Sequence, residues 1–400
     1  MQTKLFDYHL PERLIAQTPL QERDASRLLI ADPATDHIQD SFFANLPSIL
    51  HQEFCQNGKR PLIVVNRSRV FPARVRIKRT SGGRGEVFIL EQNDTGSAVS
   101  CLIRPQKKLR VGEILFADQS SEHNPVPLFQ IEKLDPPRVI PINSKLSAIM
   151  NQHGEMPLPP YIQRDPLRVG KEYSDLDKQR YQTLYAQEEG SVAAATAGLH
   201  FTKKIMDECS AFQCEFTEVI LHVGLGTFQP VQADTLAEHQ MHHENYLIPM
   251  ETAQKIADWT AKDWPILFVG TTSLRTVESF VRHAFAKHAI PICQLRNYVH
   301  EESQHNAILF RKTFENMANI WFSTNLFLHP DNLEHSKTPT LGDAILTNFH
   351  QPQSTLTMLV ASILSYPFWK KLYAHAVQQE YRFLSYGDSS LLFFAQRTHL

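Results

Sequence analysis

The residues from Gly190 to Thr202 read GSVAAATAGLHFT and place one histidine, His200, at the end of a segment of very small side chains. No side chain between Gly190 and Gly198 is larger than valine, so a second backbone or a ligand can approach closely. Thr202 stands as a helix cap before the amphipathic residues 203–212, and N–H groups at a helix N-terminus attract anions. The pattern predicts an imidazole beside an anion-binding helix end. A tightly packed core turn, in which His200 is only hydrogen-bonded, is the alternative.

Three further loops follow predicted strands and carry imidazole, hydroxyl or amide side chains. The first ends the strand 216–223 at His222, the second is GTTSLR at 270–275, and the third is NFHQP at 348–352. In a parallel sheet such loops converge at one edge, where ligands bind. We therefore predict that the turns near positions 200, 222, 271 and 350 meet at a common pocket.

Other motifs are weaker. His239, His242, His243 and Glu244 have a spacing that metal ligands can have, but no H-E-x-x-H motif occurs and no cysteine is near. We interpret them as polar loop side chains and predict no metal site. The G-x-G at 224–226 lacks the third glycine and the downstream acid of a dinucleotide-binding fingerprint.

The composition excludes several classes of protein. Of 400 residues, 42% are hydrophobic and 20% are charged, which is ordinary for a globular protein of two or three domains. The five cysteines contain no C-x-x-C pair, which favours a reducing compartment. The N-terminal residues lack the apolar core of a signal peptide, and no stretch of about 18 apolar residues predicts a membrane span. We therefore expect a cytoplasmic protein with no membrane contact.

A basic segment lies early in the chain. Between positions 66 and 112, eleven lysines and arginines stand against three acids, a net charge of +8 in a chain whose total is −2. In RVRIK at 74–78 the cations alternate with apolar residues, which is the period of a half-buried strand. Further short strands, separated by turn signals, predict a small β-barrel or sandwich; they lie at 86–91, 98–104, 113–117 and 126–131. The charge suggests a polyanionic partner, although a solvated basic face would have the same composition.

The rest of the sequence alternates strands with helices. Strands at 26–31 and 61–65 precede the basic segment, and the apolar spacing predicts helices at 175–188, 203–212, 251–262, 354–364 and 369–381. Such alternation is typical of an α/β domain. The predicted fold is an α/β main domain, formed by residues 1–66 and 141–400, with an inserted small all-β barrel domain at 67–140.

Several longer motifs match a known family. They are FDYHLP at 6–11 and the segments 17–27, 66–74, 157–162, 181–202, 221–231, 269–279, 347–359 and 381–388. On these motifs the chain resembles the S-adenosylmethionine:tRNA ribosyltransferase-isomerase family of queuosine biosynthesis. The likeness runs nearly from end to end.

The resemblance implies a fold, a reaction and partners. The fold is an α/β domain with an early β-barrel insertion, in agreement with the prediction from the residues. S-Adenosylmethionine is a co-substrate, with no tightly bound cofactor, and the partner is a tRNA carrying 7-aminomethyl-7-deazaguanine at the wobble position. The adenosyl ribose moves to the aminomethyl group and becomes an epoxycyclopentane, giving epoxyqueuosine, while adenine and methionine leave. We expect a monomer rather than an oligomer.

The chemistry suggests roles for the histidines. A sulfonium acidifies the carbon beside it, so a neutral imidazole can remove a ribose 5′ proton, and the departure of adenine needs a proton donor. We assign His200 and His222 as catalytic base and acid, in either order. The residues expected to bind the co-substrate are Thr271, Thr272, Ser273, Arg275, Asn348, His350, Ser354, Thr355, Tyr386 and Asp388. Tyr386 would stack on adenine, and Asp388 would bond its amino group or the ribose hydroxyls.

For the tRNA, cations of the basic segment are expected to contact phosphates, and Tyr161 is expected to stack on the target base. The cations are Arg69, Arg74, Arg76, Lys78, Arg104, Lys107 and Lys108. Such contacts give steep salt dependence and little sequence readout.

Some positions depart from the family pattern. Gln229 and Gln353 stand where an arginine and a lysine are usual, Arg67 replaces an acid, and Ala195 replaces a proline. Residues 329–331 lack the usual Pro-Gly-Tyr. Since a hydrogen bond to a charged group contributes roughly 1.5–3 kcal/mol, each lost cation would weaken affinity about tenfold or more. Two alternative functions are another S-adenosylmethionine-dependent tRNA-modifying enzyme, such as a methyltransferase, and a tRNA-binding homologue with reduced catalysis.

Overall fold

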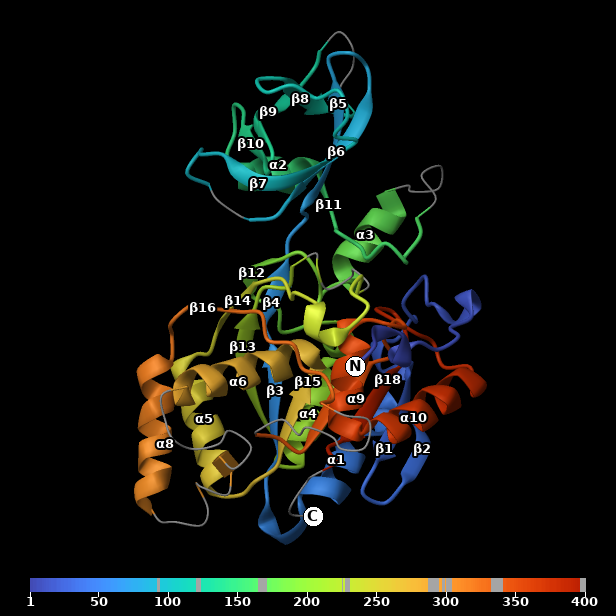
Figure 1. Cartoon of the computed structure of the whole chain (residues 1–400), viewed down its shortest axis with the longest axis vertical. Coiled ribbons are helices and arrows are strands. Elements are labelled where there is room, and N and C mark those ends of the chain that lie inside the picture. Colours follow the sequence, from blue (N-terminus) through green and yellow to red (C-terminus); the bar gives the residue numbers. More distant parts are fainter. Residues whose placement is uncertain are drawn as a thin grey trace.

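The protein is described by a computed structural model, which covers residues 1–91, 94–119, 124–164, 171–224, 226, 231–286, 295–296, 299, 304–331 and 341–395. Two lobes make up the molecule, a small β-barrel standing on a larger α/β lobe (Figure 1). The predicted fold class, an α/β main domain with an inserted all-β barrel, is confirmed.

The α/β lobe is built on a nine-stranded sheet. Its strands, in spatial order, are β16 (Phe322–Thr324), β14 (Glu244–Leu247), β13 (Glu215–Leu221), β3 (Leu62–Asn66), β15 (Ile266–Val269), β17 (Ala344–Asn348), β18 (Ser389–Phe393), β1 (Arg27–Asp32) and β2 (His37–Phe42). The four central strands β13, β3, β15 and β17 are parallel. Antiparallel pairing at β17–β18, β1–β2 and β13–β14 makes the sheet mixed, whereas the sequence reasoning assumed a parallel sheet.

Alternating side chains give the sheet two apolar faces. In β3, Leu62 and Val64 belong to one core cluster, and Ile63 and Val65 belong to another on the opposite face. Apolar residues of five helices complete the first cluster: α5 (Met250–Ala261), α6 (Gly270–Phe285), α8 (Gln304–Met317), α9 (Thr355–Leu364) and α10 (Tyr366–Gln378). The second cluster includes apolar residues of α1 (Leu46–Phe54) and α4 (Lys203–Ala211). The lobe therefore has three layers.

The barrel closes on itself. Its strands follow the order β5 (Arg74–Arg79), β6 (Arg84–Ile89), β7 (Val99–Arg104), β10 (Pro137–Pro141), β9 (Pro127–Leu134) and β8 (Ile114–Ala117), and β8 pairs back with β5. The expected alternation in β5 is present, because Val75 and Ile77 are buried in the barrel core. A short strand, β11 (Gly154–Glu155), extends the sheet at β5, and helix α2 (Leu146–His153) packs its apolar residues into the same core.

Some elements differ from the sequence prediction. The helix expected over 175–188 is α3 (Lys171–Arg180), which ends eight residues earlier than predicted, and β12 (Glu188–Ser191) then pairs with β4 (Ser68–Val70). Tyr181 and Tyr185 are buried in two different core clusters, so their apolar spacing reflects packing of an irregular segment rather than one helix face. Strands β2 and β10 and helix α2 were not predicted. Strand β2 is a mostly exposed sheet edge, which leaves little hydrophobic pattern.

Short 3₁₀ helices connect these elements. They are η1 (Thr3–Phe6), η2 (Glu12–Leu14), η3 (Arg23–Ala25), η4 (Phe43–Asn45), η5 (Gln56–Gly58), η6 (Thr196–His200) and η8 (Leu236–Glu238). Of these, η6 carries the histidine of the small-residue segment. Within the described part of the chain, the helices are too short or too polar to cross a membrane.

Candidate active site

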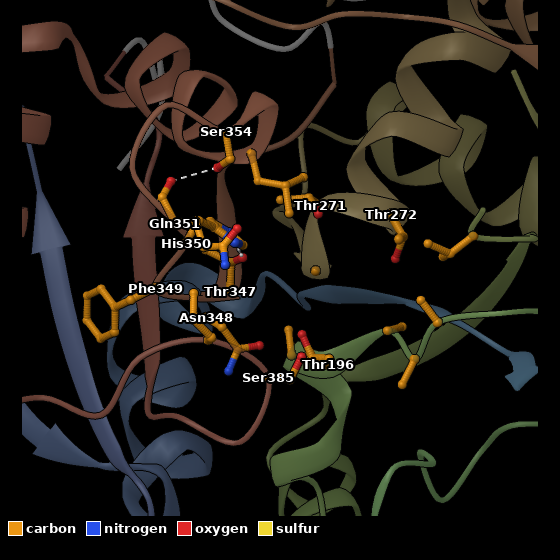
Figure 2. A pocket seen from close by; sticks show the side chains of 18 of the residues that line it. Thr196, Thr271, Thr272, Thr347, Asn348, Phe349, His350, Gln351, Ser354 and Ser385 are labelled. Carbon is orange, nitrogen blue, oxygen red and sulfur yellow. Dashed lines mark hydrogen bonds between the residues drawn. The ribbon is translucent and has the colours of Figure 1, made fainter. Parts of the chain in front are cut away.

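Separate turns of the α/β lobe meet around one cleft of about 680 Å³, which opens to solvent. Figure 2 shows Asn348 and His350 on one side of this cleft and Thr271 and Thr272 on the other. The residues that line it come from the ends of several strands and the segments beyond them: Tyr161, 193–197, Val223, 270–272, 347–351, Ser354, Leu356, Leu384 and Ser385.

Two glycines of the small-residue segment are required by close contacts. A Cβ atom on Gly198 would lie 2.0 Å from the Tyr185 hydroxyl oxygen, and one on Gly190 would lie 2.5 Å from the His222 ring. Both distances are shorter than atoms can approach, so a larger residue at either position would have to displace the ring that it meets. The groups that approach the two glycines are side chains, the Tyr185 hydroxyl and the His222 ring, whereas the sequence predicted approach by a second backbone or a ligand.

Asn348 presents an unpaired acceptor at the cleft. Its side-chain Nδ2 lies 3.2 Å from the Asp388 carbonyl oxygen and 3.2 Å from His200 Nε2. Because a carbonyl can only accept, the atom that faces it must be the amide nitrogen. The opposite atom, Asn348 Oδ1, is buried and has no hydrogen-bond partner within the described part of the chain. A buried polar atom without a partner is costly, so a ligand that donates a hydrogen bond here would be favoured.

His200 lies behind Asn348 and does not line the main cleft. It borders an adjoining cavity of about 310 Å³, together with Ser26 and Tyr386. Since Nε2 accepts from Asn348, the ring proton is on Nδ1 and is donated to Ser26 Oγ at 2.8 Å. Burial, together with the positive charges of Arg23 and Arg382, lowers the pKa of His200 to about 4. The imidazole is therefore neutral at pH 7, with both nitrogens hydrogen-bonded.

A pH titration of stability tests this neutral state. The pKa of an unfolded histidine is 6.5 and that of folded His200 is about 4, so the unfolded chain binds more protons between these values. The contribution of neutral His200 to the free energy of unfolding is therefore complete above pH 6.5 and decreases as the pH falls towards 4. We expect the unfolding free energy of the wild type to fall between pH 7 and pH 5 by about 2 kcal/mol more than that of His200→Gln, which lacks the imidazole. Urea denaturation at the two pH values measures both changes. Equal losses in the two proteins would contradict a buried neutral His200.

His350 does line the cleft. Its Nε2 lies 3.0 Å from Thr347 Oγ1, and its backbone is held by the hydroxyls of Tyr8, which donates to its carbonyl, and Tyr373, which accepts from its N–H. Burial lowers the pKa of His350 to about 3, so this imidazole is also neutral at pH 7. An uncharged ring in the cleft wall does not repel a cationic ligand.

The opposite wall is the first turn of α6. Gly270 has φ +83°, a left-handed conformation that favours glycine, and it begins this 16-residue helix at the cleft. The first-turn N–H groups have no partner within the helix, which makes this end attractive to an anion. Thr272 Oγ1 is buried without a partner among the described residues. A ligand hydroxyl, amine or carboxylate would satisfy these groups.

His222 points away from the cleft. The neighbouring Val223 lines it, and because side chains alternate along an extended chain, His222 lies on the other side. Its Nδ1 lies 2.8 Å from Ser68 Oγ, and its ring stacks on Trp321 with 5.0 Å between ring centroids. The expectation that both histidines share one pocket is therefore wrong: His200 reaches the cleft only through Asn348, and His222 does not line it.

The other predicted co-substrate residues divide into two groups. Ser354 lines the cleft, but its hydroxyl also caps α9 by accepting from Thr357 N at 3.2 Å. Tyr386 borders the His200 cavity and donates to Asp177. The remainder line neither cavity: Ser273 donates to the Val269 carbonyl, Asp388 accepts from the backbone N–H groups of Arg27 and Arg382, Arg275 pairs with Glu244, and Thr355 starts α9.

A buried ion pair joins α6 to the start of β14. Arg275 Nη1 lies 2.7 Å from Glu244 Oε2, and Glu244 Oε1 accepts from Gly224 N at 2.9 Å and lies 3.0 Å from His242 Nε2. Burial alone would raise the pKa of the Glu244 carboxyl, but the Arg275 charge and these hydrogen bonds lower it to about 2. This pair fixes the segment that follows Val223. Among the described residues, no group of three His, Cys, Asp or Glu side chains could hold a metal ion.

Ion pairs neutralise part of the positive charge of the basic segment. Acids from distant parts of the chain pair with its arginines: Arg76 with Glu155 at 2.7 Å, Arg69 with Glu189 at 3.8 Å, and Arg67 with Glu218 at 3.0 Å. Arg74 also lies 3.5 Å from Glu86 across the strand pair, and Lys78 is on the same strand. Arg104, Lys107 and Lys108 lie exposed at and beyond the end of β7.

Several cleft residues were missed by sequence reasoning. Thr196, Gln351, Leu384 and Ser385 line the cleft, and Ser26 accepts the hydrogen bond from His200 Nδ1. Thr196 and Gln351 lie inside motifs already singled out, so their position was available as a signal. Ser26 and Ser385 also lie inside segments that match the family, 17–27 and 381–388, but a serine side chain carries no chemical signal that marks it as a site residue. Tyr161 lines the cleft and its hydroxyl lies 2.6 Å from Ser385 Oγ.

Two glutamines stand where the family pattern has a cation. Gln229 lies outside the described residues, and Gln353 precedes the α9 cap with φ +53°.

The chain is similar to proteins of known name. A protein-family model described as "Queuosine biosynthesis protein" matches residues 3–392. A relative from Thermotoga maritima, named S-adenosylmethionine:tRNA ribosyltransferase-isomerase, is 35% identical over 392 residues, covering 98% of this chain and 100% of the relative. A relative of the same name from Xylella fastidiosa (strain M12) is 37% identical over 391 residues, covering 97% and 96%. A crystal structure of S-adenosylmethionine tRNA ribosyltransferase from Thermotoga maritima aligns with 97% of this chain and 99% of that one, at 25% identity and a TM-score of 0.47.

Proposed function

Because the chain belongs to the queuosine biosynthesis protein family, as an S-adenosylmethionine:tRNA ribosyltransferase-isomerase, we propose that it acts on tRNA carrying 7-aminomethyl-7-deazaguanine at the wobble position. The ribosyl group of S-adenosylmethionine is transferred to the aminomethyl nitrogen and isomerised to the epoxycyclopentane of epoxyqueuosine. Three bonds form: the carbon–nitrogen bond to the aminomethyl group, the carbon–carbon bond that closes the cyclopentane and the carbon–oxygen bond that closes the epoxide. Three bonds of the ribosyl group break: those to adenine and to the methionine sulfur, and one carbon–oxygen bond of the furanose ring. The ribose 5′ carbon and the amine each lose a proton, adenine gains one, and one proton is released as the sulfonium charge disappears.

The observation that carries this proposal is the unpaired Asn348 Oδ1 in the wall of the cleft. Across from it, the first turn of α6 offers N–H groups and the unpaired Thr272 hydroxyl. A sulfonium nucleoside has matching groups: hydroxyl and amino donors for Asn348, and a carboxylate for the helix end. The neutral His350 accommodates its positive charge.

The two histidines that contact this region take different roles. His350 lines the cleft as a neutral imidazole, and we assign its unprotonated ring nitrogen to accept the ribose 5′ proton that the sulfonium acidifies. Both nitrogens of His200 are already hydrogen-bonded, one of them to Asn348. His200 is therefore a positioning residue, which acts by holding the Asn348 amide with its oxygen towards the ligand. His222, on the far side of Val223, has no part in this arrangement.

Product analysis tests the function. The protein would be incubated with S-adenosylmethionine and tRNA bearing the deazaguanine base, and the tRNA nucleosides and small molecules analysed by mass spectrometry. We expect epoxyqueuosine together with free adenine and methionine. S-Adenosylhomocysteine would indicate methyl transfer instead, and tRNA binding without any product would indicate a homologue that has lost catalysis.

The barrel offers one docking surface for the tRNA. Lys107 and Lys108 follow β7 in an exposed loop, beside Arg104, and among the described residues their side chains form no ion pair. We expect Lys107→Glu to weaken tRNA binding and to reduce the slope of log affinity against log salt by about 1. Arg76→Glu should have a smaller effect, because Arg76 already pairs with Glu155. Unchanged binding and slope in Lys107→Glu would remove this loop from the docking surface.

A further inference from the structure

A second group of cations lies around a hollow beside the His200 cavity. The hollow contains about 1020 Å³ of space open to solvent and is bordered by Arg23, Arg69, Lys178 and Arg180, with Glu22 as the acid on its rim. We call it the arginine hollow. Arg23 and Arg180 border both this hollow and the smaller cavity that His200 lines. Helix α3, which contributes Lys178 and Arg180, lies between the barrel and the α/β lobe (Figure 1).

Two of these arginines are held in place without a carboxylate. Arg23 donates to the carbonyls of Leu199 and Gln179, at 2.9 and 3.0 Å. Arg180 donates to the carbonyls of Leu20 and Gln21, at 2.7 and 3.0 Å, and its Nε is buried without a partner. Among the described residues neither forms an ion pair. These bonds fix the direction of each guanidinium but leave its charge uncompensated, unlike Arg164, which pairs with Asp177 at 2.8 Å.

The two guanidiniums also act on each other. Burial lowers the pKa of Arg23, and the positive charge of Arg180 lowers it further, so the two groups are close enough to repel. A protein that orients like charges together gains stability when an anion binds between them. The fixed fork of a guanidinium matches a phosphate, and the hollow adds neutral polar groups at Gln179, Gln182, Thr183 and Thr202.

We propose that the arginine hollow binds backbone phosphates of the tRNA next to the modified nucleotide. This inference rests on the proposed function, because it takes the RNA substrate from it. It adds a docking site on the α/β lobe to the one expected on the barrel. The hollow shares residues with the His200 cavity, and Ser385 lines both that cavity and the main cleft, so RNA held there lies beside the site of chemistry.

The test uses exposed residues, because Arg23 and Arg180 also tie segments of the fold together. We would measure binding of an anticodon stem-loop RNA by fluorescence anisotropy from 50 to 200 mM salt, for the wild type and for Lys178→Glu. We expect weaker binding and a salt slope smaller by about 1, since each phosphate contact contributes roughly 0.7–0.9. The matched control is Lys312→Glu, on α8 at the opposite side of the lobe, which should bind like the wild type (Figure 1).

The same variants would be assayed for turnover. A raised KM for tRNA with little change in kcat supports docking in the hollow. Wild-type affinity, salt slope and KM in Lys178→Glu would overturn the inference while leaving the proposed function intact. If the wild type binds the RNA but forms neither adenine nor methionine, the proposed function fails, and the binding comparison still decides whether the hollow holds RNA. No RNA binding by the wild type would overturn both.

Discussion

Asn348→Ala is expected to lower the rate of adenine release about 10²-fold under single-turnover conditions, because it deletes the oriented acceptor in the cleft wall. The change also leaves His200 Nε2 and the Asp388 carbonyl without the amide that both now contact. Ser362→Ala is the matched control: it removes a buried hydroxyl of α9 that donates to the Leu359 carbonyl and does not line the cleft. We expect that variant to react like the wild type.

A second variant separates positioning from catalysis. Glutamine at position 200 keeps an acceptor that can hold the Asn348 amide, but it cannot carry a proton as a base. If His200 only positions Asn348, His200→Gln should retain activity within about tenfold of the wild type, and His200→Ala should lose considerably more. A general base contributes roughly 10²–10⁴-fold. The opposite result would be a loss of activity of that size in both His200→Gln and His200→Ala, with nearly normal activity in Asn348→Ala. It would show that His200 is the base and that Asn348 is not part of the site.

Glu244→Ala is expected to destabilise the fold by about 3–5 kcal/mol, because it leaves the buried Arg275 charge uncompensated. Urea unfolding at pH 7.5 would measure the loss. Glu251→Ala provides the control, since Glu251 is also a paired glutamate but is largely exposed on α5. That change should cost no more than about 1 kcal/mol.

The double variant Glu244→Met with Arg275→Met completes the comparison. Replacing both partners of a buried pair by apolar residues is often close to neutral, so the double variant should be more stable than Glu244→Ala. Activity should nevertheless fall, because the hydrogen bond from Gly224 N to Glu244 fixes the backbone next to Val223 in the cleft. A loss of less than about 1 kcal/mol in Glu244→Ala would show that the pair does not hold this region together.

Local pattern determined much of the fold. The alternation of cations and apolar residues at 74–78 predicted a barrel strand, and Val75 and Ile77 are in the barrel core. The small residues before His200 predicted a close approach, which the contacts of Gly198 and Gly190 require. The glycine and threonines that follow β15 predicted a helix N-terminus at a ligand site, and they line the cleft. These features follow from side-chain size and periodicity, which act over a few residues.

Only the tertiary structure decided which side chains face the cleft. The sequence analysis assigned the same kind of role to His200 and His222. In the structure, Asn348 lies between His200 and the cleft, and His222 points away from the cleft because the adjacent Val223 points into it. The net charge of the basic segment did not reveal that Glu155 and Glu189 would neutralise part of it. Nor did it reveal that Arg23 would lie beside Lys178 and Arg180, which are far from it in the chain, around one hollow. Hydrogen bonds and ion pairs between distant segments depend on how those segments pack together, and a pattern over a few neighbouring residues does not determine that packing.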